Sequence, residues 1–164
     1  GLIPEDRKSQ GCFLNNTIEW NISIGNIREL TTNRIVNKKK IRKQAEKYEE
    51  MLSIKTPSLT QKVGNLSGGN QQKVVLAKVL AANTDIIIFD EPTRGIDIGA
   101  RHEIYTMMSQ LVEQGKSILM VSSDMEELIG MSDRIIILSE GKMSGMLNKN
   151  EFRQEKIMNF ASPK

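Results

Sequence analysis

The stretch that most constrains this fold is the apolar run from Asp85 to Phe89, which ends in two carboxylates, Asp90 and Glu91. Because this run does not alternate with polar residues, it predicts a strand buried on both faces, in a parallel sheet that helices cover. Helix and strand patterns alternate from Asn83 onward, so the predicted class is α/β. Carboxylates at the carboxyl end of such a strand suit a magnesium ion and a polarised water.

A second motif, Leu66–Lys73, reads Leu-Ser-Gly-Gly-Asn-Gln-Gln-Lys and opens a helical pattern that continues to Asn83. Ser67 is a good N-cap, and Gly68 and Gly69 let a ligand approach the backbone closely. The free N–H groups and the partial positive charge of a helix N-terminus suit phosphate oxygens. The motif therefore predicts phosphate binding, although an ordinary serine cap also fits these residues when they are taken alone.

The sequence predicts three segments with different secondary structure. Residues 1–9 form a strand end and a loop, because Pro4 ends the pairing. Residues 10–82 carry almost no strand signal and form an inserted helical subdomain, with helices near 17–27, from Asn37 to Leu52 and at the second motif; residues 31–36 are ambiguous. Residues 83–164 form the α/β core. Its further expected elements are helices at 99–113, 124–129 and 150–160, and strands at 118–121, 134–138 and 142–147, the last two joined by a turn at Glu140-Gly141.

Together these motifs resemble those of the ABC ATPases. Leu66–Lys73 is similar to the signature motif of that family, and Ile86–Glu91 is similar to its Walker B strand. Gly95-Ile96-Asp97 stands where the family has its D-loop, and Met120–Asp124 where it has its switch loop. Ser132–Ile135, followed by Glu140-Gly141-Lys142, matches the segment after that loop. The resemblance covers nearly the whole chain.

Finer details resemble one branch of that family. Asn70 replaces the commoner glutamine, and Pro4–Lys8 stands where most relatives have a Q-loop. With Thr93–Asp97 and Ser122-Ser123, this pattern looks like the C-terminal half of the double-ATPase subunit of bacterial sugar importers of the ribose, galactose and xylose type. In that subunit two ATPase halves lie in one polypeptide.

The resemblance implies roles for individual residues around two nucleotides, each held between the Walker motifs of one half and the signature of the other. Ser67, Gly68, Gly69, Asn70 and Gln71 would contact the nucleotide held by the partner half. Asp97 would act across the dimer interface, although it also fits a helix N-cap. Asp90 would hold a water of Mg²⁺, and Glu91 would polarise the attacking water; two solvated carboxylates are the alternative.

Two positions depart from the family pattern. Ser123 stands at the switch position, where the family usually has a histidine, and serine carries no positive charge near pH 7. This departure predicts weak or absent hydrolysis at the site built on this half's own Walker motifs. Glu5 stands at the Q-loop position, where its oxygens would still reach the metal or meet the membrane subunit.

A phosphate-cradling Walker A loop requires Gly-x-x-x-x-Gly-Lys-Ser/Thr between a strand and a helix. Gly115-Lys116-Ser117 is the single partial match, but Gln110 occupies the first glycine position and Gly115 follows a helix. We therefore expect the Walker A strand, loop and helix to be absent, so that the fold is a partial P-loop NTPase core. The opening residues, Gly1–Pro4, look like the tail of a strand in mid-domain.

The predicted function is that of an ATP-binding, energy-coupling subunit of a sugar importer, with ATP and Mg²⁺ as cofactors. The implied partners are the N-terminal ATPase half, transmembrane permease subunits and, indirectly, a sugar-binding protein. The implied place is the cytoplasmic face of the bacterial inner membrane, as a peripheral protein. The alternatives are a non-transport ABC ATPase and, for this chain in isolation, a non-enzymatic interaction module that does not bind ATP.

Charge and cysteine content narrow the classes further. The formal net charge of +3 is too small to argue for nucleic acid, and the single cysteine, Cys12, excludes an internal disulfide framework and reads as a small buried residue. The basic run Lys38–Lys43 could touch anionic lipid or nucleic acid. Glu46, Glu49 and Glu50 favour a solvated helix face instead.

Overall fold

The computed structural model describes residues 1–32, 34–96 and 98–162. Contacts divide the chain into two compact units, Gly1–Val121 and Ser122–Lys164. This boundary falls inside the segment 83–164 that the sequence predicts to be one α/β core. No helix among the described residues is both long enough and apolar enough to span a bilayer.

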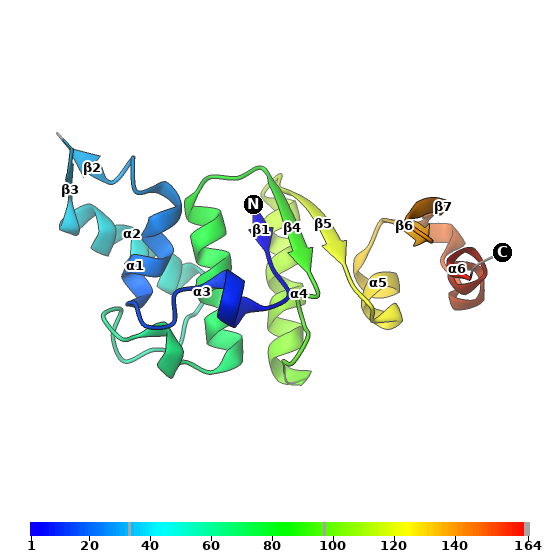
Figure 1. Cartoon of the computed structure of the whole chain (residues 1–164), viewed down its shortest axis with the longest axis horizontal. Helices are drawn as coiled ribbons and strands as arrows, with labels where there is room; N and C mark the ends of the chain where they lie inside the picture. The colour runs from blue at the N-terminus through cyan, green and yellow to red at the C-terminus, as the bar shows by residue number, and fades with distance from the viewer. Residues whose placement is uncertain (33, 97, 163–164) are drawn as a thin grey trace. The chain divides into compact units, whose positions relative to one another are not determined.

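The first unit contains a three-stranded parallel sheet in the order β1 (Leu2–Ile3), β4 (Ile86–Asp90) and β5 (Ser117–Val121) (Figure 1). Ile3 pairs with Phe89, and Phe89 pairs with Met120. Parallel neighbours that lie far apart in the sequence require crossover connections, which here contain helices. The predicted α/β class, the strand end before Pro4 and the strands predicted at 85–89 and 118–121 are confirmed.

The prediction that β4 is buried on both faces is wrong for the described part of the chain. Ile87 and Phe89 are buried, whereas Ile86 is 61% exposed and Ile88 is 36% exposed. Leu2, Ile88 and Leu119 lie in register across the three strands, and all three are exposed. Helix α3 (Gly68–Ala81) contacts β1 and helix α4 (Ile98–Glu113) contacts β5, but no described residue of the first unit covers this second face.

Residues 10–82 are mainly helical and contain α1 (Ile18–Ser23), α2 (Lys38–Met51) and α3, while their separation as an inserted subdomain stays a prediction. Thr17 and Asn37 cap the first two helices through their side chains. Helix α1 contacts both α2 and α3. The core between these helices is aliphatic. Its fully buried residues are Ile18, Ile22, Val74, Val75 and Ala77.

Shorter elements join these helices. The ambiguous segment 31–36 contains an antiparallel hairpin of two short strands, β2 (Thr31–Thr32) and β3 (Ile35–Val36). Single turns of helix lie at η1 (Arg7–Gly11), η2 (Ile24–Asn26) and η3 (Val63–Asn65). Asp6 caps η1, and its hydrogen bonds to Ser9 and to the backbone of Lys8 hold the pKa of its carboxyl below the ordinary value.

The second unit contains α5 (Met125–Met131), the antiparallel strands β6 (Arg134–Ser139) and β7 (Lys142–Asn148), η4 (Lys149–Glu151) and α6 (Gln154–Ala161). Its core consists of Ile135, Ile137, Leu147 and Ile157. Glu140 and Gly141 both have positive φ, which is the backbone of a type I′ turn, so the predicted hairpin is confirmed. The last helix starts later than expected because η4 precedes it.

Candidate functional site

The signature motif lies at the N-terminus of α3 with its serine as the cap. Ser67 is extended (φ −60°, ψ 158°), and its Oγ accepts a hydrogen bond from Asn70 N at 3.5 Å. Asn70 Nδ2 donates to the same oxygen at 3.0 Å. Since both bonds use the lone pairs of Oγ, the hydroxyl proton of Ser67 remains to be donated to another acceptor.

Asn70 is itself fixed by a loop that lies fifteen positions earlier in the chain. The backbone N–H of Lys55 donates to Asn70 Oδ1 at 2.8 Å. This bond orients the side-chain amide, so that its nitrogen faces Ser67 and its oxygen faces the loop. The arrangement connects the loop after α2 to the signature serine through one side chain.

Gln71 has a different environment from its neighbours. It is buried, and its Nε2 donates to the carbonyl of Leu66 at 3.1 Å and to that of Val63 at 3.4 Å. These bonds hold the η3 loop against α3. The nucleotide contact predicted for Gln71 stays a prediction, while these hydrogen bonds give its side chain a structural role in holding the η3 loop.

A hollow of about 300 Å³ opens beside the signature residues. Its lining is shared between the signature, the loop after α2 and the start of α4: Lys55, Ser67, Gly69, Asn70, Lys73, Gly99 and Glu103. Lys73 is almost fully buried, and its Nζ lies 2.8 Å from Glu103 Oε2 and 3.1 Å from the carbonyl of Ser53. Because Glu103 already neutralises Lys73, Lys55 is the lining cation that stays available to an anion.

Lys55 and Arg7 are site residues that the sequence reasoning missed. A Cβ added to Gly68 would lie 2.7 Å from Arg7 Nη2, so the guanidinium rests against the first signature glycine. Any larger residue at position 68 would have to displace it. Arg7 lies more than fifty positions before the signature and Lys55 lies in an irregular loop, so no local pattern brings either of them to this helix.

The carboxylates lie at the carboxyl end of β4, as predicted. Glu91 N donates to the carbonyl of Val121 at 2.8 Å, and Glu91 has a φ of +48°. This left-handed conformation is strained for a residue with a side chain and recurs at functional sites. The turn that follows is closed by Arg94 N to Glu91 O and by Ile96 N to Thr93 O. Asp97, the predicted D-loop residue, lies outside the described residues.

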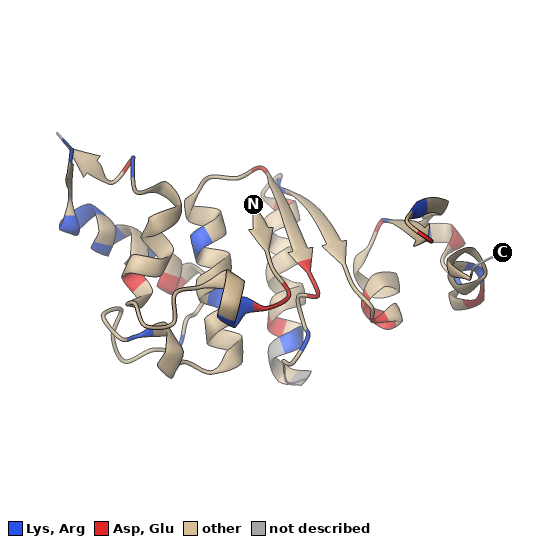
Figure 2. Ribbon diagram, in the orientation of Figure 1, with Lys and Arg blue, Asp and Glu red and all other residues tan. Residues whose placement is uncertain are grey.

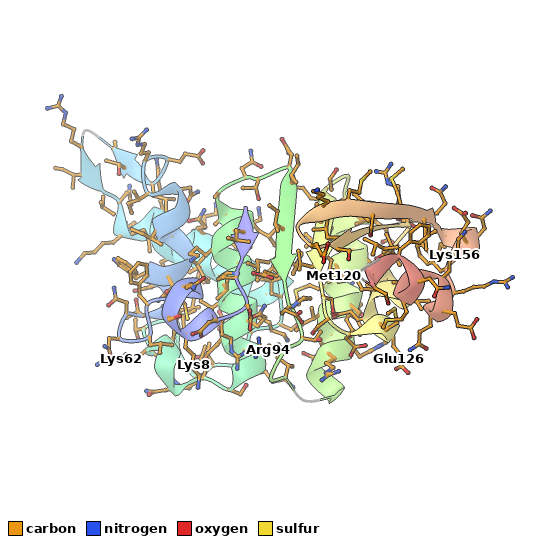
Figure 3. All side chains as sticks on the ribbon, turned by 45° about the vertical axis from the view of Figure 1, so that its right-hand side comes forward. Lys8, Lys62, Arg94, Met120, Glu126 and Lys156 are labelled. Carbon is orange, nitrogen blue, oxygen red and sulfur yellow. The ribbon has the colours of Figure 1, made fainter. Side chains whose placement is uncertain are left out.

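Glu5 leaves β1 at the same end of the sheet as Asp90, because Ile3 pairs with Phe89. It forms an ion pair with Arg94, which Figure 3 labels. Both side chains are substantially exposed, so the pair adds little stability. Among the described residues, no group of three or more histidine, cysteine or acidic residues comes together as a metal site. The metal contacts of Asp90 and Glu5 stay predictions.

The switch position belongs to the second unit. Asp124 caps α5, since its Oδ1 accepts from Glu126 N at 3.0 Å and from Glu127 N at 3.2 Å. Ser122 Oγ donates to Glu127, and Ser123 between these residues is exposed. The catalytic consequence of Ser123 stays a prediction.

The fold and the signature helix define the class of this protein as an ATP-binding cassette. A dimeric cassette in a post-hydrolysis state bound to ADP and Pi superposes with a TM-score of 0.75 at 25% identity, covering 93% of this chain and 63% of that one. A putative metal-chelate type ABC transporter in an inward-facing conformation shares the fold at 15% identity, with a TM-score of 0.80 over 98% of this chain and 62% of that one.

Residues 6–94 match the model of the ABC transporter family, and the chain belongs to that family. It is 48% identical over 97% of its length to the ribose import ATP-binding protein RbsA of Clostridium tetani, of which it covers 32%. It is 48% identical over 98% of its length to the xylose import ATP-binding protein XylG of Moorella thermoacetica, of which it also covers 32%. The chain thus spans about a third of the length of these curated relatives.

Proposed function

We propose that this chain is the signature-bearing part of an ATP-binding subunit that powers a sugar importer. The observation that carries the proposal is the hollow at the N-terminus of α3, where the Ser67 hydroxyl, the backbone at Gly69 and Lys55 gather. A hydroxyl proton, free helix N–H groups and a cation at one point favour a phosphate oxygen. The relatives named as ribose and xylose import proteins supply the substrate class.

In this proposal the signature acts on ATP that a partner ATPase half holds. Ser67 would donate its proton to the γ-phosphate, while Asn70 keeps the acceptor lone pairs of Oγ occupied. Lys55 would add positive charge at the rim of the hollow. The further partners are transmembrane permease subunits and, through them, a sugar-binding protein, so the chain would lie peripherally at the cytoplasmic face of the inner membrane.

The carboxyl end of β4 fits a second nucleotide site. Mg²⁺ prefers oxygen ligands and keeps several waters, and Asp90 and Glu5 offer carboxylate oxygens at one end of the sheet. A bound Mg·ATP would supply the phosphoryl group that water attacks, and Glu91 would orient that water. With Ser123 at the switch position, this second site would hydrolyse slowly or not at all.

Substitution of Ser67 by arginine in the assembled importer tests the proposal. The arginine side chain would fill the hollow and exclude the partner's γ-phosphate, so sugar uptake and coupled ATP hydrolysis fall to background. Ser109→Arg is the matched control, because Ser109 lies exposed on α4 and does not line the hollow. Normal uptake by the Ser67→Arg importer, with both variants folded by circular dichroism, would overturn the proposal.

A further inference from the structure

The mainly helical segment 10–82 carries a cluster of cations that the proposed nucleotide chemistry does not use. We call it the basic hairpin patch and define it by residues on the turn before β3, on β3 and on the first turns of α2: Arg34, Ile35, Val36, Lys38, Lys39, Lys40 and Lys43. Residues 34–43 contain six lysine and arginine residues and no acid. Because the whole chain has a net charge of +3, the remaining residues sum to −3. Figure 2 shows basic residues gathered at the start of α2.

Intramolecular pairing does not account for these charges. Arg42 is engaged by Glu46 at 2.9 Å and by Glu19 at 3.5 Å. No acidic side chain of the described residues forms an ion pair with any of the other five cations. Lys38, Lys39 and Lys40 occupy the first turn of α2, where the helix dipole is positive and a lysine is unfavourable. Folding stability therefore does not explain why three lysines lie there.

The same patch exposes aliphatic side chains. Ile35 is 73% exposed and Val36 is 43% exposed. Thr32 pairs with Ile35 and Thr31 with Val36, and consecutive strand residues point to opposite faces. Both faces of the hairpin therefore carry an uncovered aliphatic group, directly before the lysines. A surface that combines exposed aliphatic groups with neighbouring lysines suits the boundary between the headgroups and the acyl chains of a bilayer.

We propose that the basic hairpin patch docks on an anionic phospholipid surface, with Ile35 and Val36 entering the headgroup boundary and the lysines facing lipid phosphates. Residues 28–43 contain no aromatic side chain on which nucleic-acid bases would stack, which favours lipid over single-stranded nucleic acid. This contact goes beyond the proposed function, which brings the chain to the membrane only through permease subunits.

Vesicle co-sedimentation of the purified protein tests this docking. The protein should sediment with vesicles that contain phosphatidylglycerol and stay in solution with vesicles of phosphatidylcholine alone, and added salt should release it. Each lysine near an anionic surface contributes about 1 kcal/mol. The triple variant Lys38→Gln, Lys39→Gln, Lys40→Gln should therefore bind about a hundredfold more weakly. Ile35→Ser should weaken binding without changing its salt dependence.

A matched triple variant, Lys62→Gln, Lys142→Gln, Lys149→Gln, removes three exposed lysines elsewhere and should bind as the wild type does. Thermal unfolding checks that both triple variants fold, which is expected because all six side chains are exposed. Equal binding to neutral vesicles, equal loss in the two triple variants, or tighter binding to duplex DNA than to anionic vesicles would each overturn the proposal. Failure of the Ser67→Arg experiment would leave these outcomes unchanged.

Discussion

The N-terminus of α3 and the carboxyl end of β4 differ in how completely this chain builds them. At α3, the signature serine is bonded to Asn70, Asn70 is bonded to the Lys55 loop, and most of the helix behind them is buried. At β4, Glu91 follows the strand in a strained, left-handed conformation. One apolar face of the sheet is exposed in the described part of the chain. At α3, contacts among the described residues hold the signature residues in position. At β4, the strands are paired, but the described helices pack on one face of the sheet only.

This difference teaches that a site residue and its support need not come from the same stretch of sequence. Ser67 has its orienting partners within the first unit, so it can present a fixed hydroxyl to a ligand held elsewhere. Asp90 and Glu91 depend on a sheet whose second face is exposed among the described residues. We therefore expect the signature end to tolerate little change and the carboxylate end to tolerate more.

The largest expected effect separates the two faces of β4. Ile87→Ala should lower the free energy of unfolding by about 2–5 kcal/mol, because it leaves a cavity in the buried face. The matched change Ile86→Ala, one position earlier on the uncovered face, should stay within about 0.5 kcal/mol. Urea denaturation measures both. Equal losses would show that the second face is covered in solution and would remove the contrast.

The next effect contrasts the carboxylate end of this half with the corresponding end of the other ATPase half in the assembled importer. A working general base contributes about 10²–10⁴-fold to a reaction rate. Glu91→Gln should reduce sugar uptake by less than this range, because Ser123 predicts that the site on this half turns over poorly. The same substitution at the corresponding glutamate of the other ATPase half should reach the range. Equal losses in the two halves would argue against the asymmetry inferred from Ser123.

A smaller effect tests the orientation of the signature serine. Asn70→Ala removes the Nδ2 donor, and one net hydrogen bond of about 1 kcal/mol corresponds to roughly a fivefold loss of ATP turnover. Asn70→Asp should lose more, because its carboxylate accepts the Ser67 proton and repels phosphate. Asn65→Ala is the control, since Asn65 is exposed and does not line the hollow. Turnover equal to the wild type in Asn70→Asp would contradict this orientation.

The smallest effect uses Cys12 as a probe of how tightly the η1 segment packs against α3. Cys12 is buried, its thiol donates to the carbonyl of Arg7, and burial raises the pKa of the thiol above its ordinary value. Since only the thiolate reacts, labelling by a thiol reagent should be several-fold slower than for a free thiol. Its pH midpoint should lie higher than that of a free thiol, and urea should abolish both differences. Labelling at the free-thiol rate in native buffer would show that the η1 segment opens readily.

Much of the fold follows from local pattern. The run at residues 85–89 predicted a strand, Ser67 predicted a cap, and the Glu140-Gly141 pair predicted a hairpin turn, because each signal acts over a few residues. The hairpin of β2 and β3 was not predicted, because its strands have two residues each and show no alternation of apolar and polar residues. The prediction that the second face of β4 is buried was wrong, because apolarity reports what a strand prefers and the described residues do not cover that face.

The residues of the site motifs could be predicted from the sequence, whereas the tertiary contacts that hold them in position could not. The signature serine and the two carboxylates stand out in the sequence by spacing and residue type. The bond from the Lys55 backbone to Asn70 and the contact of Arg7 with Gly68 depend on tertiary packing across fifteen and more than fifty positions. No periodicity carries such information. The same holds for the left-handed backbone at Glu91, which only the turn after β4 imposes.

The pairing of β1 with β4 also sets an order of events when the protein is made. Gly1 N donates to the carbonyl of Ile86 across 85 residues. Closing a loop of that length costs about 4 kcal/mol of chain entropy. At about 5–20 residues per second of synthesis, β1 waits on the order of ten seconds before its neighbour exists. The helices between β1 and β4 can form their local contacts during that wait, so β1 finds its strand partner only after they have been made.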